Sequence, residues 1–406
     1  MRGLWTRNFS ILFSGQLVST IGNSLFFLAL PWYVFSMTHS KSMLVLVGLA
    51  QTLPMVAGLF TGVFIDRWQK RTVMLISDTI RALLCALLFI SVLSHASIWT
   101  LLCIVLALQF VGTFFGPASN AILPLLVDDS QLEAGIGLFQ STNGVSQLIG
   151  TVAGGALLLL LGAPLLFLLN AITFLLSALS LMFLRVQEVK LVHTGDGSAS
   201  FFSSMRVGWM VLFRSKFMIL MVAAALIANF AFAPIDIGLT AWVKGSMQGT
   251  SLDLGLISGA FCAGMIGGSV AMAWFTRHLP IRWLVCSSLL IMGLTVGIIT
   301  LSNSTLWAAS LLFLTGFASG TLNGTVGVLL IRSIPAAVRA RVFGTMTGLA
   351  VLAMPLGMGV FGAILAHDSI RLVFLLSGSI AILSGLLILL PIRDDVANLA
   401  RDVEVA

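Results

Sequence analysis

Charged residues are scarce in this chain, since only 9% of its 406 residues are Asp, Glu, Lys or Arg. An ordinary soluble domain is about 25% charged. Hydrophobic residues make up 59% of the chain, the mean hydropathy is +1.10, and the excess extends over the whole length. The composition therefore excludes a soluble protein and indicates a polytopic, all-α membrane protein.

Cysteine and histidine are also few, and their positions exclude several kinds of site. The four cysteines lie inside apolar runs without CxxC spacing, so we expect buried thiols rather than disulfides or metal ligands. The five histidines lie in loops or at span ends, and no HExxH, Ser/His/Asp or phosphate-loop pattern occurs. We therefore expect no cofactor and no metal, and an enzyme is the least favoured function.

The net charge of +7 does not indicate a nucleic-acid partner, because the basic residues follow membrane topology. Of the 21 Lys and Arg, all but Lys41, Lys244 and Arg371 fall in segments that we assign to one side. This asymmetry is typical of the cytoplasmic side of a membrane protein. We expect a multi-pass protein of the bacterial cytoplasmic (inner) membrane with both termini in the cytoplasm and the lipid bilayer as its surroundings.

Long apolar runs define the expected helices, since about 20 apolar residues cross a bilayer. The weakest separation is the turn at Gly162, Ala163 and Pro164. The sequence predicts about twelve spans: 9–36, 43–65, 72–94, 97–123, 134–160, 162–184, 217–243, 252–276, 281–301, 305–332, 340–366 and 370–391.

A polar segment near the midpoint divides these spans into two sets of six. Residues 194–200 within it have the composition of a flexible linker. We expect four parts: a six-helix bundle at 1–184, a cytoplasmic linker at 185–216, a six-helix bundle at 217–392 and a cytoplasmic tail at 393–406. An offset of 207 residues pairs Gly137 with Gly344, Gly150 with Gly357 and Gly155 with Gly362, which is weak support for two repeats.

A charged loop between the second and third spans carries a recognisable motif. Its sequence is Gly62-x-x-x-Asp66-Arg67-x-x-Lys70-Arg71. This motif resembles the loop between helices 2 and 3 of the major facilitator superfamily, with Gln69 in place of a glycine. Four further stretches are similar to the macrolide-efflux and enterobactin-exporter branch of that family: Gln16–Gly22, Phe115–Pro124, Arg339–Gly344 and Ala353–Gly357.

The resemblance implies a secondary active exporter of bulky hydrophobic or amphiphilic compounds, such as a macrolide or a siderophore. It implies alternating access of two six-helix bundles, proton antiport and a monomer. Two departures weaken parts of this expectation. Gln109 stands where many proton-coupled exporters carry a membrane-embedded arginine, and Thr151 replaces the proline of the exporter motif. A lipid or lysophospholipid flippase, an uncoupled facilitator and, less favoured, a non-transporting membrane sensor remain alternatives.

Charged residues around the loop are the candidates for gating. Asp78 and Arg81 lie three residues apart and share one helix face, near the start of the third span. A charge network there would hold one of two bundle arrangements closed. The alternative is that basic loops simply anchor helices. The gating candidates are Asp66, Arg67, Arg71, Asp78 and Arg81.

Asp236 is the candidate for proton coupling, because no other acidic residue lies so far inside an apolar span. It follows Lys216 by about 20 residues, or roughly 30 Å of helix, which places it in the outer half of the membrane. Pro234 should break the helix just before it. An ionisable group in a span indicates function, and the alternative is a hydrated Asp close to the outer surface, near Lys244.

A cavity with several Phe residues and amides but almost no charge suits a lipophilic small molecule. Such amides equally bind neighbouring helices, and such rings equally face lipid. The candidate substrate-binding residues are Gln16, Asn23, Phe26, Gln109, Phe110, Asn143, Gln147, Asn229, Phe230 and Asn323.

Overall fold

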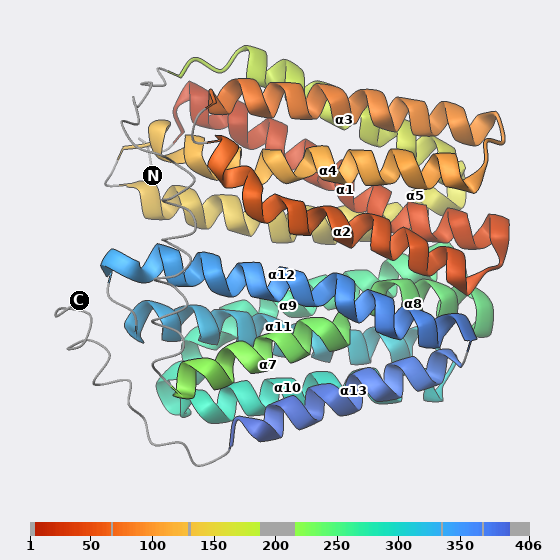
Figure 1. Cartoon of the computed structure of the whole chain (residues 1–406), viewed down its shortest axis with the longest axis vertical. Coiled ribbons are helices and arrows are strands. Elements are labelled where there is room, and N and C mark those ends of the chain that lie inside the picture. The colour runs from red at the N-terminus through yellow and green to blue at the C-terminus, as the bar shows by residue number, and fades with distance from the viewer. Residues whose placement is uncertain are drawn as a thin grey trace. The chain divides into compact units, whose positions relative to one another are not determined.

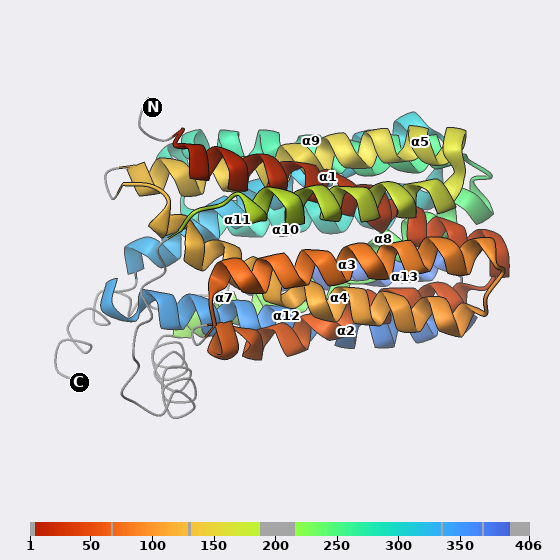
Figure 2. The same cartoon turned by 90° about the horizontal axis from the view of Figure 1, so that it is seen from above.

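The computed structural model describes residues 5–65, 68–128, 131–186, 216–333, 336–367 and 369–389. Every regular element in these ranges is a helix, which confirms the predicted all-α class. The described residues form two compact units. Unit 1 contains the described residues up to 186 together with Val243–Gly259, and unit 2 contains 216–242 and the described residues from Ala260 onward. Within each unit the long helices run side by side (Figures 1 and 2).

The helices of unit 1 begin and end close to the predicted spans. Thr6 and Ser97 accept hydrogen bonds from the amides of Phe9 and Thr100, and these caps fix the first turns of two of the helices. The elements are α1 (Arg7–Thr38), α2 (Lys41–Ile65), α3 (Lys70–Leu93), α4 (Ile98–Ile122), η1 (Leu123–Leu125) and α5 (Leu132–Met182).

The 51-residue helix α5 is interrupted at Gly162, where φ is 77° and ψ is 164°. Glycine adopts this conformation without a steric penalty, and Pro164 follows directly. Gly150 in the first half of α5 contacts α1 near Ser24, and Gly154 contacts it near Leu25, so this half runs parallel to α1.

The second half of α5 runs in the opposite direction along α1. Gly22 of α1 lies against Thr173, whereas the earlier Gly15 lies against the later Ser180. The chain therefore reverses at Gly162, and the turn predicted there separates two spans.

Unit 2 begins with a broken helix, as predicted from Pro234. Helix α7 ends at Phe232, and Pro234 caps the short helix that follows. Two elements, η3 (Trp242–Ser246) and α9 (Ser251–His278), contain residues of both units. The remaining elements are α7 (Lys216–Phe232), α8 (Ile235–Ala241), α10 (Ile281–Ile298), η4 (Ile299–Leu301), α11 (Thr305–Ser333), α12 (Ala336–His367) and α13 (Ile370–Leu387).

Glycines bring the backbones of unit 2 into direct contact. A methyl group added to Gly316 of α11 would overlap the carbonyl oxygen of Phe261 in α9, and one added to Gly268 of α9 would overlap that of Phe317 in α11. Small residues permit such close approach between membrane helices, where no hydrophobic force drives association. The interface between α9 and α11 therefore depends on glycine.

Two of the three glycine pairs predicted from the 207-residue offset have matching surroundings, and Gly155 with Gly362 stays a prediction. Gly137 and Gly344 both face open space. Gly150 lies against the Ile21 carbonyl of α1, and Gly357 lies against the Phe230 carbonyl of α7. Each contact joins a glycine to the first helix of its own unit, so the offset relates equivalent positions of two structural repeats.

Eleven helices in the described ranges are long and apolar enough to cross a membrane. One of them, Ala134–Met182, has 49 residues and contains the turn at Gly162. Since about 20 residues suffice for one crossing, its two halves account for two of the expected spans. The protein is a multi-pass membrane protein. The proposed linker and tail lie largely outside the described residues, and the predicted division into four parts stays a prediction.

Candidate functional site

A buried ion pair occupies the interior of unit 1. Asp78 and Arg81 lie one turn apart on α3, with exposed fractions of 0% and 7%. Nη1 of Arg81 lies 3.4 Å from Oδ1 of Asp78. The other carboxylate oxygen, Oδ2, and the Nε of Arg81 are buried and have no hydrogen-bond partner among the described residues. The two charges therefore use only part of their hydrogen-bonding capacity.

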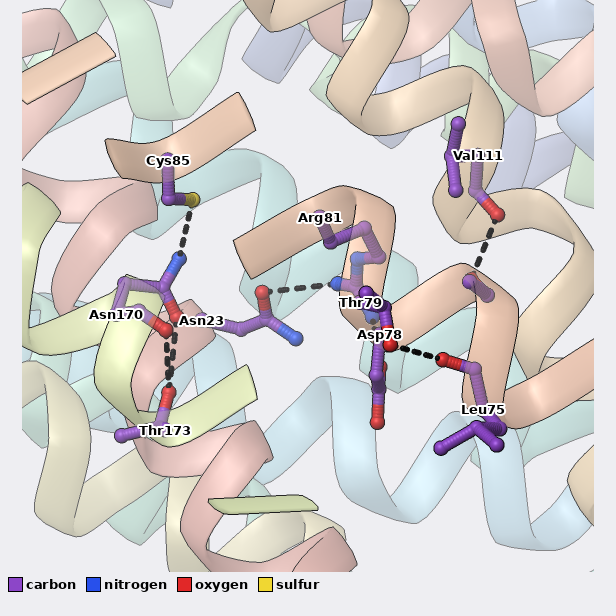
Figure 3. A network of polar contacts seen from close by, with 10 residues as sticks. Asn23, Leu75, Asp78, Thr79, Arg81, Cys85, Val111, Asn170 and Thr173 are labelled. Carbon is purple, nitrogen blue, oxygen red and sulfur yellow. Dashed lines mark hydrogen bonds and ion pairs between the residues drawn. The ribbon is translucent and has the colours of Figure 1, made fainter. Parts of the chain in front are cut away.

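Arg81 has further partners on other helices of the unit. Its Nη2 donates to Oδ1 of Asn23 in α1 at 3.0 Å, and Figure 3 shows the Asn23 side chain extending toward it. The guanidinium carbon lies 3.8 Å from the ring centroid of Phe174 in α5. On α4, Gly112 leaves room for the guanidinium, since a methyl group there would lie 3.6 Å from Nε. Four helices thus meet around one cation.

A second group of polar contacts joins α3 to α5. Nδ2 of Asn170 donates to Sγ of Cys85 at 3.6 Å, and the Thr173 hydroxyl donates to the Asn170 carbonyl oxygen at 2.8 Å (Figure 3). Gly22 of α1 lies directly against Asn170 and Thr173. We call Asn23, Asp78, Arg81, Asn170 and Phe174 the polar cluster of unit 1.

The charged loop is only partly described. Asp66 and Arg67 lie outside the described residues, so their predicted gating role stays a prediction. Arg71 donates from Nε to the Leu181 carbonyl oxygen at 2.9 Å and from Nη2 to that of Met182 at 2.7 Å. These carbonyls belong to the last turn of α5, where a cation stabilises the helix end. Arg71 therefore fastens the end of α5 to the start of α3.

Asp236 lies in the first turn of α8, and its side chain is exposed. Lys244, its suggested neighbour, is directed elsewhere. The ammonium of Lys244 lies 4.5 Å from the Trp32 ring centroid and donates to the Ser36 hydroxyl, both on α1. The predicted role of Asp236 in proton coupling stays a prediction, and Asp236 belongs to unit 2.

Some candidate substrate-binding residues of unit 1 contact other side chains of the protein, and others are exposed or lack a hydrogen-bond partner among the described residues. Asn23 binds Arg81, and Phe26 is fully buried against Phe167 at 5.8 Å between ring centroids. Gln16 and Gln109 each hold a buried polar atom without a partner among the described residues. The remaining candidates are Phe110 and Gln147, which are exposed, and Asn143, which is half-buried.

The candidates of unit 2 make local contacts. Asn229 donates to the Ala225 carbonyl oxygen of its own helix at 2.8 Å, and Phe230 packs on Phe361 with a centroid distance of 5.5 Å. Asn323 is exposed, with its amide 3.5 Å from the Ser319 hydroxyl. Nothing in these contacts joins them to a polar cluster like that of unit 1.

An apolar groove between α1 and α5 was not predicted as such. Its volume is about 270 Å³. Ser141, Thr142 and Ser146 also line it, and the hydroxyls of Ser141 and Thr142 donate to carbonyl oxygens of their own helix. The other lining residues are Phe13, Leu17, Ile21, Leu138, Val145 and Ile149. Sequence reasoning considered amides and Phe rings, and it missed a groove that aliphatic side chains mostly form.

Asn170 and Gln51 were also missed, although both are buried polar residues in apolar helices. An amide side chain within an apolar run is the signal that could have identified them, and the same signal selected Asn23 and Gln109. Within the described ranges no group of three or more His, Cys, Asp or Glu side chains is placed to hold a metal ion.

Comparison with known proteins identifies the fold and the relatives. The family model described as Major Facilitator Superfamily matches residues 12–357 and 238–405. Macrolide efflux protein A of Streptococcus pyogenes is 24% identical over 388 residues, covering 93% of this chain and 94% of that protein. The multidrug efflux pump Tap of Mycolicibacterium fortuitum is 23% identical over 372 residues, covering 90% of each.

Solved structures show the same fold at low identity. The nucleoside transporter NupG aligns with a TM-score of 0.72 at 15% identity, over 94% of this chain and 98% of that one. A bacterial homologue of the human lysosomal transporter Spinster aligns with a TM-score of 0.71 at 14% identity, over 94% of each chain. The relatives and the fold are those of transporters rather than enzymes.

Proposed function

The chain belongs to the Major Facilitator Superfamily, and we propose that it exports bulky, mostly apolar compounds in exchange for protons. The names of its relatives support export, because macrolide and multidrug efflux proteins match over 90% or more of this chain. Alternating access of two repeats about a central site is the mechanism that this fold serves. The proposal places the protein in the bacterial cytoplasmic membrane as a monomer with both termini in the cytoplasm.

The groove between α1 and α5 is the observation that carries the substrate class. Its accessible lining is almost entirely aliphatic and aromatic carbon, and no lining residue is charged. Such a surface suits the apolar part of a ligand. It does not suit a sugar phosphate or a dicarboxylate, which need convergent cations.

The groove can be tested by filling it. Val145 is exposed on the groove side of α5, and a Trp there overfills the space. Overpacking costs about 1–3 kcal/mol, so we expect Val145→Trp to raise the KM for radiolabelled erythromycin in everted membrane vesicles by about tenfold. Leu160→Trp is the matched control, because Leu160 is exposed on the same helix but outside the groove.

The outcomes separate the candidate functions. Equal KM values for both variants would remove the groove from the substrate path. Erythromycin flux that does not respond to a pH gradient would favour an uncoupled facilitator. Movement of a fluorescent lysophospholipid, rather than erythromycin, in the same vesicles would favour the flippase.

Gating by the charged loop is part of the proposal. Arg71 holds the end of α5, and Asp66 and Arg67 precede it in the same charged loop of the sequence. We expect Asp66→Asn to lower the rate of erythromycin transport, whereas its affinity changes little. A wild-type rate in Asp66→Asn would contradict the gate.

A further inference from the structure

The Asp78–Arg81 pair is built differently from an ion pair that only stabilises a fold. Charge-assisted hydrogen bonds between a cation and a carboxylate are usually about 2.7–2.9 Å long, and arginine usually binds a carboxylate through two of them. Here a single contact of 3.4 Å joins the two groups. Oδ2 of Asp78 and Nε of Arg81 remain without partners in the described part of the chain, although both are buried.

Arg81 does not depend on Asp78 for its position. Asn23 accepts one of its hydrogen bonds at 3.0 Å, and the face of Phe174 lies 3.8 Å from the guanidinium carbon. Cation–π contacts of this kind strengthen when the cation is removed from water. The cation would therefore keep two partners, from α1 and α5, if the Asp78 carboxylate lost its charge.

Other charged side chains do not compensate for Asp78. Along the described helices α1, α4 and α5 the charged residues are Arg7 and Glu133, which lie in first turns. On α3, Cys85 lies one turn beyond Arg81 and is contacted by Asn170, and Lys70 and Arg71 lie in the first turn of the helix. From α5, the Ser177 hydroxyl faces Asp78. The charge state of the site is thus decided by Asp78 and Arg81.

Unit 2 shows that a bundle of this kind folds without such a pair. By the 207-residue offset, Val285 is the equivalent of Asp78 and Ser288 is the equivalent of Arg81. Both Val285 and Ser288 are buried in α10. Buried ion pairs are often no more stabilising than apolar residues of the same volume. Unit 2 therefore forms the corresponding helices without a charged residue at either of these two positions.

We infer that Asp78 is a proton-binding carboxylate of this transporter, and that Asn23 and Phe174 hold Arg81 while Asp78 changes its charge. A proton from water bonds to Oδ2, the carboxylate becomes a neutral acid, and the positive charge stays on Arg81. The site then changes from net neutral to +1. The neutral and the charged site are stabilised by different environments. Protonation of Asp78 can therefore change the relative stability of two conformations, which is how a proton is coupled to a conformational change. The coupling rests on the proposed function, whereas proton binding does not.

Infrared difference spectroscopy tests proton binding without any substrate. We expect the purified protein in liposomes to gain a carbonyl band of a protonated, buried carboxylic acid on mild acidification. The band should be absent from Asp78→Asn and present in Asp128→Asn, since Asp128 is an exposed loop residue that undergoes the same chemical change. A band that persists in Asp78→Asn, or no band in the folded wild type, would overturn the inference.

Transport then tests the coupling with erythromycin as the probe. We expect Asp78→Asn to exchange labelled erythromycin across the membrane, while proton movement falls to that of protein-free liposomes. Full proton movement in this variant would overturn the coupling role. If wild type and Asp128→Asn move no erythromycin but show the infrared band, the proposed substrate fails and proton binding at Asp78 is still supported.

A second variant guards against loss of fold. In the double variant Asp78→Val/Arg81→Met, the valine is the residue that unit 2 has at the equivalent position. The methionine fills the volume of the guanidinium. We expect it to fold with at least wild-type stability and to lack both the infrared band and proton movement. An unfolded variant would assign the pair to folding and overturn the inference.

Discussion

The two repeats hold their helices together in different ways. In unit 1, Arg81 joins α3 to α1 and α5 through Asn23 and Phe174. At the positions equivalent to Arg81, Asn23 and Phe174, unit 2 has Ser288, Phe230 and Ala381, which carry no charge and no amide. The same arrangement of helices therefore tolerates a polar or an apolar interior.

Direct backbone contacts at glycine join several helices of unit 2. Gly316 and Gly268 place α9 and α11 against each other's carbonyl oxygens, and Gly293 of α10 does the same with Gly378 of α13. In unit 1 Gly155 and Gly255 make such a backbone contact between α5 and α9, whereas Gly22 lies against the side chains of Thr173 and Asn170. The comparison teaches that polarity in unit 1 is not a general requirement of the fold, and four substitutions sharpen it.

The largest loss of unfolding free energy is expected from Arg81→Gln. Removing one member of a buried ion pair costs about 3–5 kcal/mol, because the other charge is left uncompensated. Asp78→Asn should cost less, since Arg81 keeps Asn23 and Phe174. Denaturation in mixed micelles measures both. The cost of Arg81→Gln should shrink at acidic pH, where a protonated Asp78 needs no cation, and equal costs for the two variants would contradict the described roles.

The next effect is expected from Gly316→Ala in unit 2. The new methyl group would overlap the Phe261 carbonyl oxygen, and backbone cannot move aside without separating α9 from α11. Overpacking of this kind costs about 1–3 kcal/mol. Gly327→Ala on the same helix has open space around it and should be neutral or stabilising by about 0.5–1 kcal/mol. Thermal unfolding of both variants in detergent decides whether glycine contact holds this interface.

A smaller effect is expected from Gly22→Ala in unit 1. Its methyl group would meet the Thr173 hydroxyl and lie 2.7 Å from Oδ1 of Asn170, which are side-chain atoms that can shift. We expect a loss of about 1 kcal/mol. Adding Thr173→Ala should restore most of this loss in the same unfolding measurement. Absence of any rescue would show that the contact is as rigid as the one at Gly316.

The smallest effect is expected from Arg71→Ala, at the end of α5. The side chain donates two hydrogen bonds to carbonyls, but it is only partly buried, so we expect a loss of about 1 kcal/mol. Arg71→Lys keeps the charge and loses the two-pronged geometry, so it should fall between the alanine variant and the wild type. A lysine variant as unstable as the alanine variant would assign the effect to geometry alone.

Local features of the fold were predictable from sequence. Gly162 and Pro164 indicated a turn and Pro234 indicated a break, because the conformations of these two residue types are set within a few positions of the chain. The i, i+3 spacing of Asp78 and Arg81 placed them on one helix face, and the structure pairs them. Such features need no knowledge of which helices pack together.

Contacts between distant residues were not predictable in the same way. Asn23 was selected as a polar residue in a span, but nothing in the sequence joins it to Arg81, 58 positions later. The contact between Gly316 and Phe261 is harder still to predict. The lipid-facing and protein-facing sides of a membrane helix are both apolar, so the sequence does not distinguish them. For the same reason the groove between α1 and α5 was missed, whereas individual Phe and amide residues were considered.

The turn at Gly162 also bears on how the protein enters a membrane. From Ala134 to Leu184 the sequence has no charged residue, and the reversal at Gly162 has no polar loop to anchor at a membrane surface. The two halves of α5 must therefore be inserted together, as a single helical hairpin, and neither is oriented by flanking charges of its own. Their orientation is inherited from Arg185 and the basic residues of the neighbouring segments, so a lysine placed at Ala163 would act on biogenesis before it acted on transport.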